Sequence, residues 1–172
     1  NSDLLAYDKF CQTIIKNLKI GQYYLNTIFQ TFDNKDSEHI AQSPHLDRIP
    51  TLKFMLYLND LTNENGAFCL SPGSNHWTTQ KFKINRKSFS NKEFLEETRE
   101  IPKPILDRMI PIEGAAGTII IFNTDCVHHQ GLVYSGSACI IRSHYKKKKL
   151  SQGFLFKKKS ALKHFVRKSY FR

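Results

Sequence analysis

Three residues of this sequence could bind one metal ion: His45, Asp47 and a histidine near position 128. The first two stand two positions apart in PHLD, and the third follows the run GTIIIFNTDCV. Residues i and i+2 of a β-strand point to the same face, so His45 and Asp47 can reach one ion from one strand. Two imidazoles and a carboxylate suit Fe(II), and they leave three octahedral positions open for a co-substrate and O2. The pattern indicates an oxygen-activating metalloenzyme.

Two points stay open in this pattern. The distal ligand is either His128 or His129, because adjacent residues of a strand face opposite ways and only one of them can reach the ion. The ligand types also fix neither the metal nor the co-substrate. A zinc enzyme, or an iron enzyme that uses no 2-oxoglutarate, is therefore compatible with the same residues.

The elements that must position these residues are mostly short strands. The apolar periodicity of residues 3–18 predicts an amphipathic helix that ends near Gly21. Stretches rich in β-branched and aromatic residues, bounded by Gly, Pro, Asn and Asp, predict strands. These expected strands are 22–32, a second one leading into His45, 51–59, 67–70, 109–112, 118–122 and 138–145. With a last helix expected at about 160–170, the pattern favours a mainly β sandwich or jelly roll.

The organisation of the chain is that of a single domain, residues 1–172, without a repeat or a dividing linker. We expect a flanking helix within residues 1–20 and an excursion at 78–108, with a short helix at 94–98. Long insertions usually lie where function varies, so the excursion is predicted to be a lid over the substrate.

The positive charge is concentrated in a tail at 146–172. The last 30 residues hold nine Lys, two Arg and no acid, which leaves 15 of the 26 basic side chains to balance all 15 acidic ones elsewhere. The whole net charge of +11 therefore lies at this end. Such a tail could bind polyanions weakly, such as nucleic acid or an anionic membrane surface, although a solvated lysine-rich end is the simpler interpretation.

The sequence predicts a cytoplasmic protein. It contains no run of 18 apolar residues that would span a membrane, and its first residues lack the layout of a signal peptide. The four cysteines are scattered, which is typical of reduced thiols rather than of a disulfide framework.

Four motifs in order resemble the phytanoyl-CoA dioxygenase family of Fe(II)- and 2-oxoglutarate-dependent oxygenases. They are HLD at 45–47, LKFMLYLNDLTNENGAF at 52–68, SPGSNHW at 71–77 and GTIIIFNTDCVHHQG at 117–131. HxD alone is weak evidence, but the four motifs together are specific, and they extend over about half of the chain.

The resemblance implies a double-stranded β-helix, a cupin-like jelly-roll barrel with the metal inside one mouth. It implies Fe(II) held by His45, Asp47 and His128, because the family's distal ligand lies six residues after Phe122. It also implies 2-oxoglutarate and O2 as co-substrates, with succinate and CO2 as co-products. The expected activity is hydroxylation of an unidentified small organic substrate, without catalytic side chains beyond the metal ligands.

Three residues are candidates for binding 2-oxoglutarate. Arg142, on the last expected strand, offers two parallel donors that suit the far carboxylate. Lys53 is the alternative holder of this carboxylate. It shares the polar face of strand 51–59 with Tyr57, and both would meet the co-substrate or the substrate if that face lines the barrel. If it does not, Lys53 is an outward, solvated side chain.

Two other functions are compatible with the sequence. The basic tail could direct an oxygenase to nucleic acid or to a protein associated with it. A cupin-like domain could also keep the barrel without the chemistry and serve in binding alone.

Overall fold

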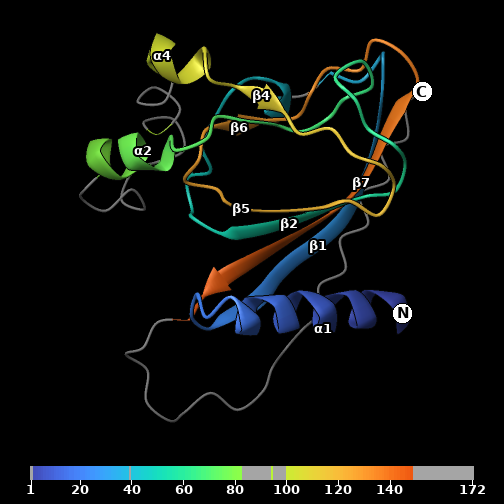
Figure 1. The fold of residues 1–172 in the computed structure, drawn as a ribbon, viewed down its shortest axis with the longest axis vertical. Coiled ribbons are helices and arrows are strands. Elements are labelled where there is room, and N and C mark those ends of the chain that lie inside the picture. The colour runs from blue at the N-terminus through green and yellow to red at the C-terminus, as the bar shows by residue number, and fades with distance from the viewer. Residues whose placement is uncertain (1, 39, 83–93, 95–99, 149–172) are drawn as a thin grey trace.

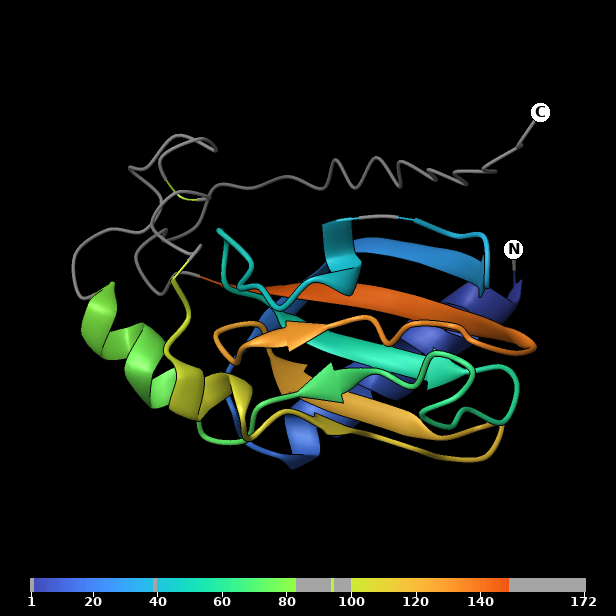
Figure 2. The same ribbon diagram turned by 90° about the horizontal axis from the view of Figure 1, so that it is seen from above.

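The computed structural model describes residues 2–38, 40–82, 94 and 100–148, and its regular structure is mainly antiparallel β. A four-stranded sheet has the order β1-β7-β2-β5, and a three-stranded sheet has the order β4-β3-β6. The strands are β1 (Tyr23–Asn34), β2 (Leu52–Tyr57), β3 (Cys69–Leu70), β4 (Ile110–Pro111), β5 (Ile119–Asn123), β6 (His128–His129) and β7 (Ser137–Lys147). The smaller sheet lies over β2 and β5 (Figure 1), and the axes of the strands are roughly aligned when seen from above (Figure 2). The predicted jelly-roll architecture is confirmed.

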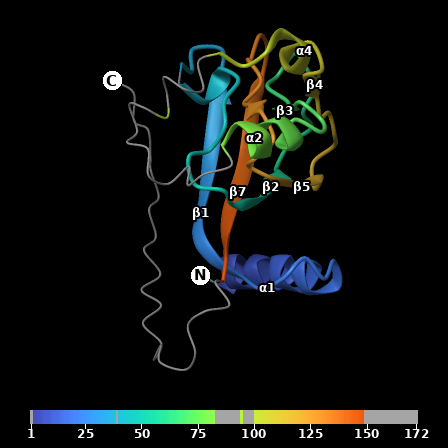
Figure 3. The ribbon, with the colours of Figure 1, turned by 90° about the vertical axis from the view of Figure 1, so that its left-hand side faces the viewer.

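The helix expected at 3–18 is α1 (Ser2–Asn17), and it packs on the outer face of the larger sheet. Its buried side chains Cys11 and Ile15 contact Phe54 of β2 and Tyr145 of β7. The hydroxyl of Tyr145 also donates a hydrogen bond to Asp8 of α1, at 2.8 Å. Figure 3 shows α1 running across the ends of β1 and β7.

β2 is covered on both faces. Leu52 and Phe54 point toward α1, whereas Met55 and Tyr57 point into the space between the sheets, where they join a second buried cluster. Lys53 belongs to this inner face and is only 8% exposed. The face that appears polar in the sequence therefore lines the barrel.

The prediction of a strand that leads into His45 is wrong. The chain forms a short 3-10 helix, η1 (Ile40–Gln42), and His45 then makes an isolated bridge with β6. Asp47 lies outside any strand. Pro44 and Pro50 flank this segment. Because proline has no N–H to donate, each one interrupts a ladder of backbone hydrogen bonds at its position.

The described part of the excursion at 78–108 contains the end of α2 (Asn75–Lys81), Phe94 and α4 (Lys103–Leu106). Neither α2 nor α4 was expected from the sequence. Phe94 packs in a third buried cluster that includes Leu46 and Val127. The excursion thus rests on residues that immediately neighbour the predicted metal ligands.

Two expectations lie outside the described residues: the helix at 94–98, apart from Phe94, and the C-terminal helix at 160–170. The basic tail is described only up to Lys148. Within the described part of the chain, no helix is long and apolar enough to cross a membrane.

Candidate metal centre

His45 and His128 lie side by side because their backbones pair. The N–H of each residue donates to the carbonyl of the other, and both N···O distances are 3.0 Å. The ring centroids are 4.5 Å apart. His128 is further held by β6, which pairs with Cys69 and Leu70 of β3.

Both rings are fixed in the same tautomer. Nδ1 of His45 lies 2.8 Å from the carbonyl oxygen of Ser43, and Nδ1 of His128 lies 2.7 Å from that of Cys126. Because a carbonyl oxygen only accepts, each Nδ1 carries the proton. Each Nε2 therefore presents a lone pair, as a metal-binding imidazole requires.

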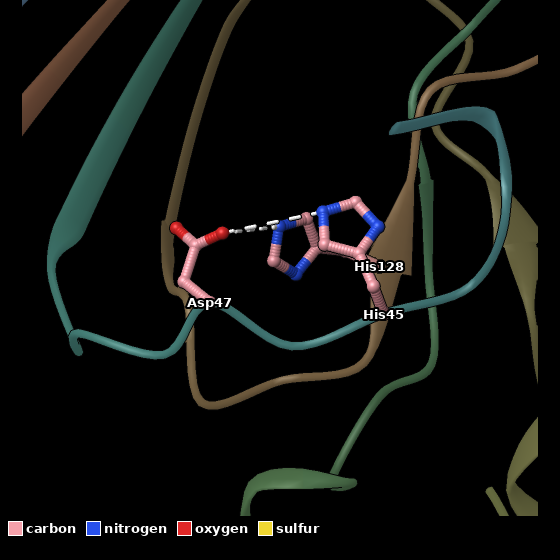
Figure 4. Close-up of side chains that lie close together, drawn as sticks. All are labelled: His45, Asp47 and His128. Atoms are coloured by element: carbon pink, nitrogen blue, oxygen red, sulfur yellow. Dashed lines mark ion pairs between the residues drawn. The ribbon is translucent and has the colours of Figure 1, made fainter. Parts of the chain in front are cut away.

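The two Nε2 atoms converge on one carboxylate oxygen (Figure 4). Oδ1 of Asp47 lies 4.0 Å from Nε2 of His45 and 3.8 Å from Nε2 of His128. These distances exceed those of direct hydrogen bonds, so the three groups do not satisfy one another. The three donor atoms lie within 4.8 Å of one another and could hold a metal ion.

Burial sets the protonation of the three groups. It lowers the pKa of His128 to about 3, and it also lowers the pKa of His45. Burial acts to raise the pKa of Asp47, but nearby positive charge, above all Lys53, outweighs it and leaves the pKa of this carboxyl below its usual value. At neutral pH the site thus presents neutral imidazoles and an ionised carboxylate, the forms that bind a metal.

Lys53 lies beside this triad rather than in solvent. Its Nζ is 3.1 Å from Oδ2 of Asp47 and 3.4 Å from Nε2 of His128. Phe68 and Phe122 flank the ring of His128, at centroid distances of 5.7 and 5.0 Å. The ring of His128 therefore lies against two aromatic side chains and one ammonium group.

The SPGS segment holds the backbone that leads into His128. The Ser74 hydroxyl accepts the N–H of Val127 at 2.8 Å and donates to the carbonyl of Ser71 at 2.7 Å. The N–H of Ser71 in turn donates to the carbonyl of Val127 at 3.0 Å. The sequence motif contains both serines, but their positioning role follows only from these contacts.

Arg142 lies deeper on the inner face of β7, opposite Met55 of β2. Its guanidinium donates to the side-chain oxygen of Gln130, and Nη2 lies 3.9 Å from Oδ2 of Asp33. Gln130 is itself held by a 2.7 Å hydrogen bond to the carbonyl of Gly66. Among the described residues, Nε of Arg142 has no hydrogen-bond partner, so this buried group keeps a donor for an anion.

Gln130 and Asp33 were missed in the sequence as members of this region. Gln130 stands two residues after His128, a spacing that could have drawn attention to it. Asp33 follows the strand expected at 22–32, in a run of polar residues that suggests a turn, whereas the structure places it within β1. His144 lies opposite Lys53 in the β2–β7 register, a neighbour that is evident only from the pairing.

The two other candidate residues, Tyr57 and His129, both make hydrogen bonds with the backbone. The hydroxyl of Tyr57 donates to the carbonyl of Ile112 at 2.8 Å and accepts the N–H of Phe68 at 3.0 Å, which leaves one lone pair for a ligand. His129 turns away from the triad, and its Nδ1 lies 2.8 Å from the carbonyl of Gln130. The geometry brings together His128, not His129, with His45 and Asp47.

Solved structures with this fold are distant in sequence. The epimerase SnoN, in complex with Fe3+, alpha ketoglutarate and nogalamycin RO, has a TM-score of 0.60 at 14% identity, over 80% of this chain and 55% of SnoN. HygX from Streptomyces hygroscopicus, with nickel and 2-oxoglutarate bound, has a TM-score of 0.53 at 15% identity, over 84% of this chain and 66% of HygX. The carbocyclase SnoK has a TM-score of 0.51 at 13% identity, over 80% and 55% of the two chains. This chain thus spans less than two thirds of the length of these proteins.

No curated protein matches the sequence. The sequence profile of the family described as Phytanoyl-CoA dioxygenase (PhyH), however, matches residues 13–137, well over half of the chain. This range contains the complete His-Asp-His triad, the SPGS segment and all strands except most of β7. The chain therefore belongs to the phytanoyl-CoA dioxygenase family.

Proposed function

We propose that this protein is an Fe(II)- and 2-oxoglutarate-dependent oxygenase that hydroxylates a small organic molecule. The observation that carries the proposal is the convergence of two imidazole Nε2 atoms, each with its tautomer fixed, on the ionised carboxylate of Asp47. Two imidazoles and one carboxylate are the donor set of non-haem Fe(II) oxygenases. The family membership supports the same reaction class.

The protein's own residues would hold and orient the reactants. His45, Asp47 and His128 would bind Fe(II), which, together with 2-oxoglutarate, supplies the chemistry of O2 activation with succinate and CO2 as co-products. Arg142 would pair with the far carboxylate of 2-oxoglutarate through the donor that it keeps unpaired. Lys53, beside the triad, would face the end of the co-substrate nearest the metal.

Hydroxylation is the finer part of this proposal. SnoN is an epimerase and SnoK a carbocyclase, so proteins of this fold catalyse different overall reactions. Hydroxylation is the outcome that needs no special control of the substrate after hydrogen abstraction. Product analysis by mass spectrometry would distinguish the gain of one oxygen atom from an isomeric product of unchanged mass.

The excursion at 78–108 would form the substrate lid. Its described side chains Phe94, Ile101 and Ile105 pack against Leu46 and Val127, each adjacent to a ligand of the triad. This contact supports a lid whose position is coupled to the backbone of the metal ligands.

The single-domain organisation and the cytoplasmic location are also proposals. The four free cysteines support the cytoplasmic location.

The test of the oxygenase is anaerobic titration of the Fe(II)-loaded protein with 2-oxoglutarate. We expect a visible charge-transfer band that needs both components. The variants His45→Ala and Asp47→Ala should lose it, and His129→Ala, the matched control, should keep it. Iron binding without the band would point to a metalloenzyme of another kind, and the absence of iron binding would point to a cupin-like binding domain.

A second function rests on the charge distribution alone. An oxygenase directed to nucleic acid by residues 146–172 would bind DNA or RNA with a steep salt dependence, which would be lost when the tail is removed. Most of this tail lies outside the described residues. Binding that is unaffected by truncation would exclude this role for the tail.

A further inference from the structure

Lys53 is a buried cationic side chain on the inner face of β2. In the β2–β5 and β2–β7 registers it stands between Phe122 and His144. Its Nζ lies 5.8 Å from the centroid of the Phe122 ring, and its side chain is only 10% exposed. Water therefore does little to screen this charge from its neighbours.

The ammonium group contacts two of the three donors of the triad. Nζ is 3.1 Å from Oδ2 of Asp47 and 3.4 Å from the Nε2 lone pair of His128. An ammonium has three hydrogens and no lone pair, so it satisfies these acceptors but cannot itself bind a metal. A divalent ion that binds the same donors would lie next to this positive charge.

We propose that Lys53 is a resident counter-cation, which occupies the triad before metal binding and must withdraw for a divalent ion to enter. The inference rests on the proposed function, since it concerns the same triad. Lys53 offsets the charge of Asp47 in the metal-free protein, so this partly buried carboxylate has an ionic partner. The ion must then overcome both the loss of this ion pair and the repulsion between the two cations.

His144 provides the place to which Lys53 withdraws. It lies directly opposite Lys53 across the β2–β7 pair, where side chains share a face. Its ring contacts Phe29, at a centroid distance of 5.6 Å, and its buried Nε2 has no hydrogen-bond partner among the described residues. With its proton on Nδ1, His144 would offer this Nε2 as an acceptor to the ammonium group once Asp47 and His128 bind the ion.

The direct test is Co(II) titration of the metal-free protein, with affinity read from the d–d absorption bands and from calorimetry. We expect Lys53→Met to bind Co(II) about tenfold or more tightly than the wild type, because one repelling charge has been removed. Lys16→Met is the matched control: it removes the same charge from an exposed position on α1, on the opposite side of the larger sheet, and should bind like the wild type. Equal or weaker binding by Lys53→Met would overturn the inference.

A second variant tests the withdrawal site without altering Lys53. His144→Phe keeps an aromatic ring but removes the acceptor, so Co(II) binding should weaken about fivefold. Unchanged binding by this variant would exclude His144 as the withdrawal site. Melting curves of the metal-free variants establish that each one is folded.

The outcomes separate this inference from the proposed function. If the wild type, Lys53→Met and Lys16→Met all bind Co(II) equally, the triad is a metal site and only the role of Lys53 is wrong. If none of them binds Co(II), the proposed oxygenase is itself wrong.

Discussion

His45 and His128 hydrogen-bond to each other through both their backbone N–H groups and both their carbonyls. The bridge is isolated, so it is not the end of a longer ladder. It fixes the separation of the two rings before any ion is present. The pairing of the two histidine ligands rests on this bridge, which the hydrogen bond from the N–H of Gln130 to the carbonyl of Ala41 supports, and a metal ion would add a further connection between the same segments.

Metal binding should stabilise the folded protein. A ligand that binds only the native state at 100 times its Kd contributes about 2.7 kcal/mol to the free energy of unfolding. We expect Co(II) to raise the melting temperature and a chelator to reverse the change, as followed by circular dichroism. His129→Ala should retain this shift and His45→Ala should lose it; a shift that persists in His45→Ala would place the ion elsewhere.

Ser74→Ala should destabilise the protein and weaken its metal binding. The substitution leaves the buried N–H of Val127 without its acceptor, which costs about 1–3 kcal/mol. The loss also frees the backbone that positions His128. Urea denaturation and Co(II) titration would measure the two effects.

The control for Ser74 is Thr79→Ala on α2. Its hydroxyl donates to the carbonyl of Asn75 at 2.8 Å from an exposed position. This change should alter the free energy of unfolding by less than about 0.5 kcal/mol and leave Co(II) affinity unchanged. Equal effects of both substitutions would contradict the positioning role of Ser74.

Gln130→Met should weaken the binding of 2-oxoglutarate while sparing the metal site. The substitution keeps the side-chain volume but removes the oxygen that accepts from Arg142, so the guanidinium is no longer fixed on that side. We expect the Kd of 2-oxoglutarate for the Fe(II) protein to rise about tenfold, which corresponds to about 1.4 kcal/mol. The charge-transfer titration gives this value directly.

Gln30→Met is the matched control for Gln130→Met. Gln30 is an exposed residue of β1 whose side-chain amide donates to the sulfur of Cys139. It should leave the affinity for 2-oxoglutarate at the wild-type value. If Gln130→Met also leaves it there, Arg142 is either positioned by other contacts or does not bind the co-substrate.

Gly131→Ala should be strongly destabilising. A Cβ atom at Gly131 would lie 2.2 Å from the backbone oxygen of Ala67, which a side-chain movement cannot relieve. We expect a loss of about 3 kcal/mol in urea denaturation. At Gly73 the φ of +75° disfavours alanine but no atom lies within 4 Å, so Gly73→Ala should cost only about 1 kcal/mol. The opposite order would show that the backbone near Gly131 adapts.

Much of the fold could be predicted because helical and strand periodicities differ. The apolar spacing of residues 3–18 predicts α1, although the helix ends at Asn17 rather than near Gly21. For β2, however, alternation alone could not distinguish a barrel-lining face from a solvated one. Met55 and Tyr57 are core residues, and Lys53 is buried because it has an ionic partner in Asp47.

The site was less predictable than the fold. His45 and Asp47 could be identified from their types and spacing, but the reason first given, a shared strand face, does not apply to the irregular segment between Pro44 and Pro50. The selection of His128 came from the family resemblance and agrees with the geometry. Contacts such as those of Gln130 and Asp33 with Arg142 depend on strand register, which a single sequence does not specify.

Because β2 is covered on both faces, different parts of the protein should open to solvent at different rates. β2 is paired on both edges and packed on both faces, so its amide hydrogens should exchange with solvent only when the whole domain unfolds. His45, by contrast, lies in an irregular segment that joins β6 through the isolated bridge and through the hydrogen bond from the N–H of Gln130 to the carbonyl of Ala41, so it can separate from His128 in a local fluctuation. Asp47, five residues before β2, stays with the slowly exchanging part. An ion could therefore enter or leave by transient opening at His45, on a timescale far shorter than that of global unfolding.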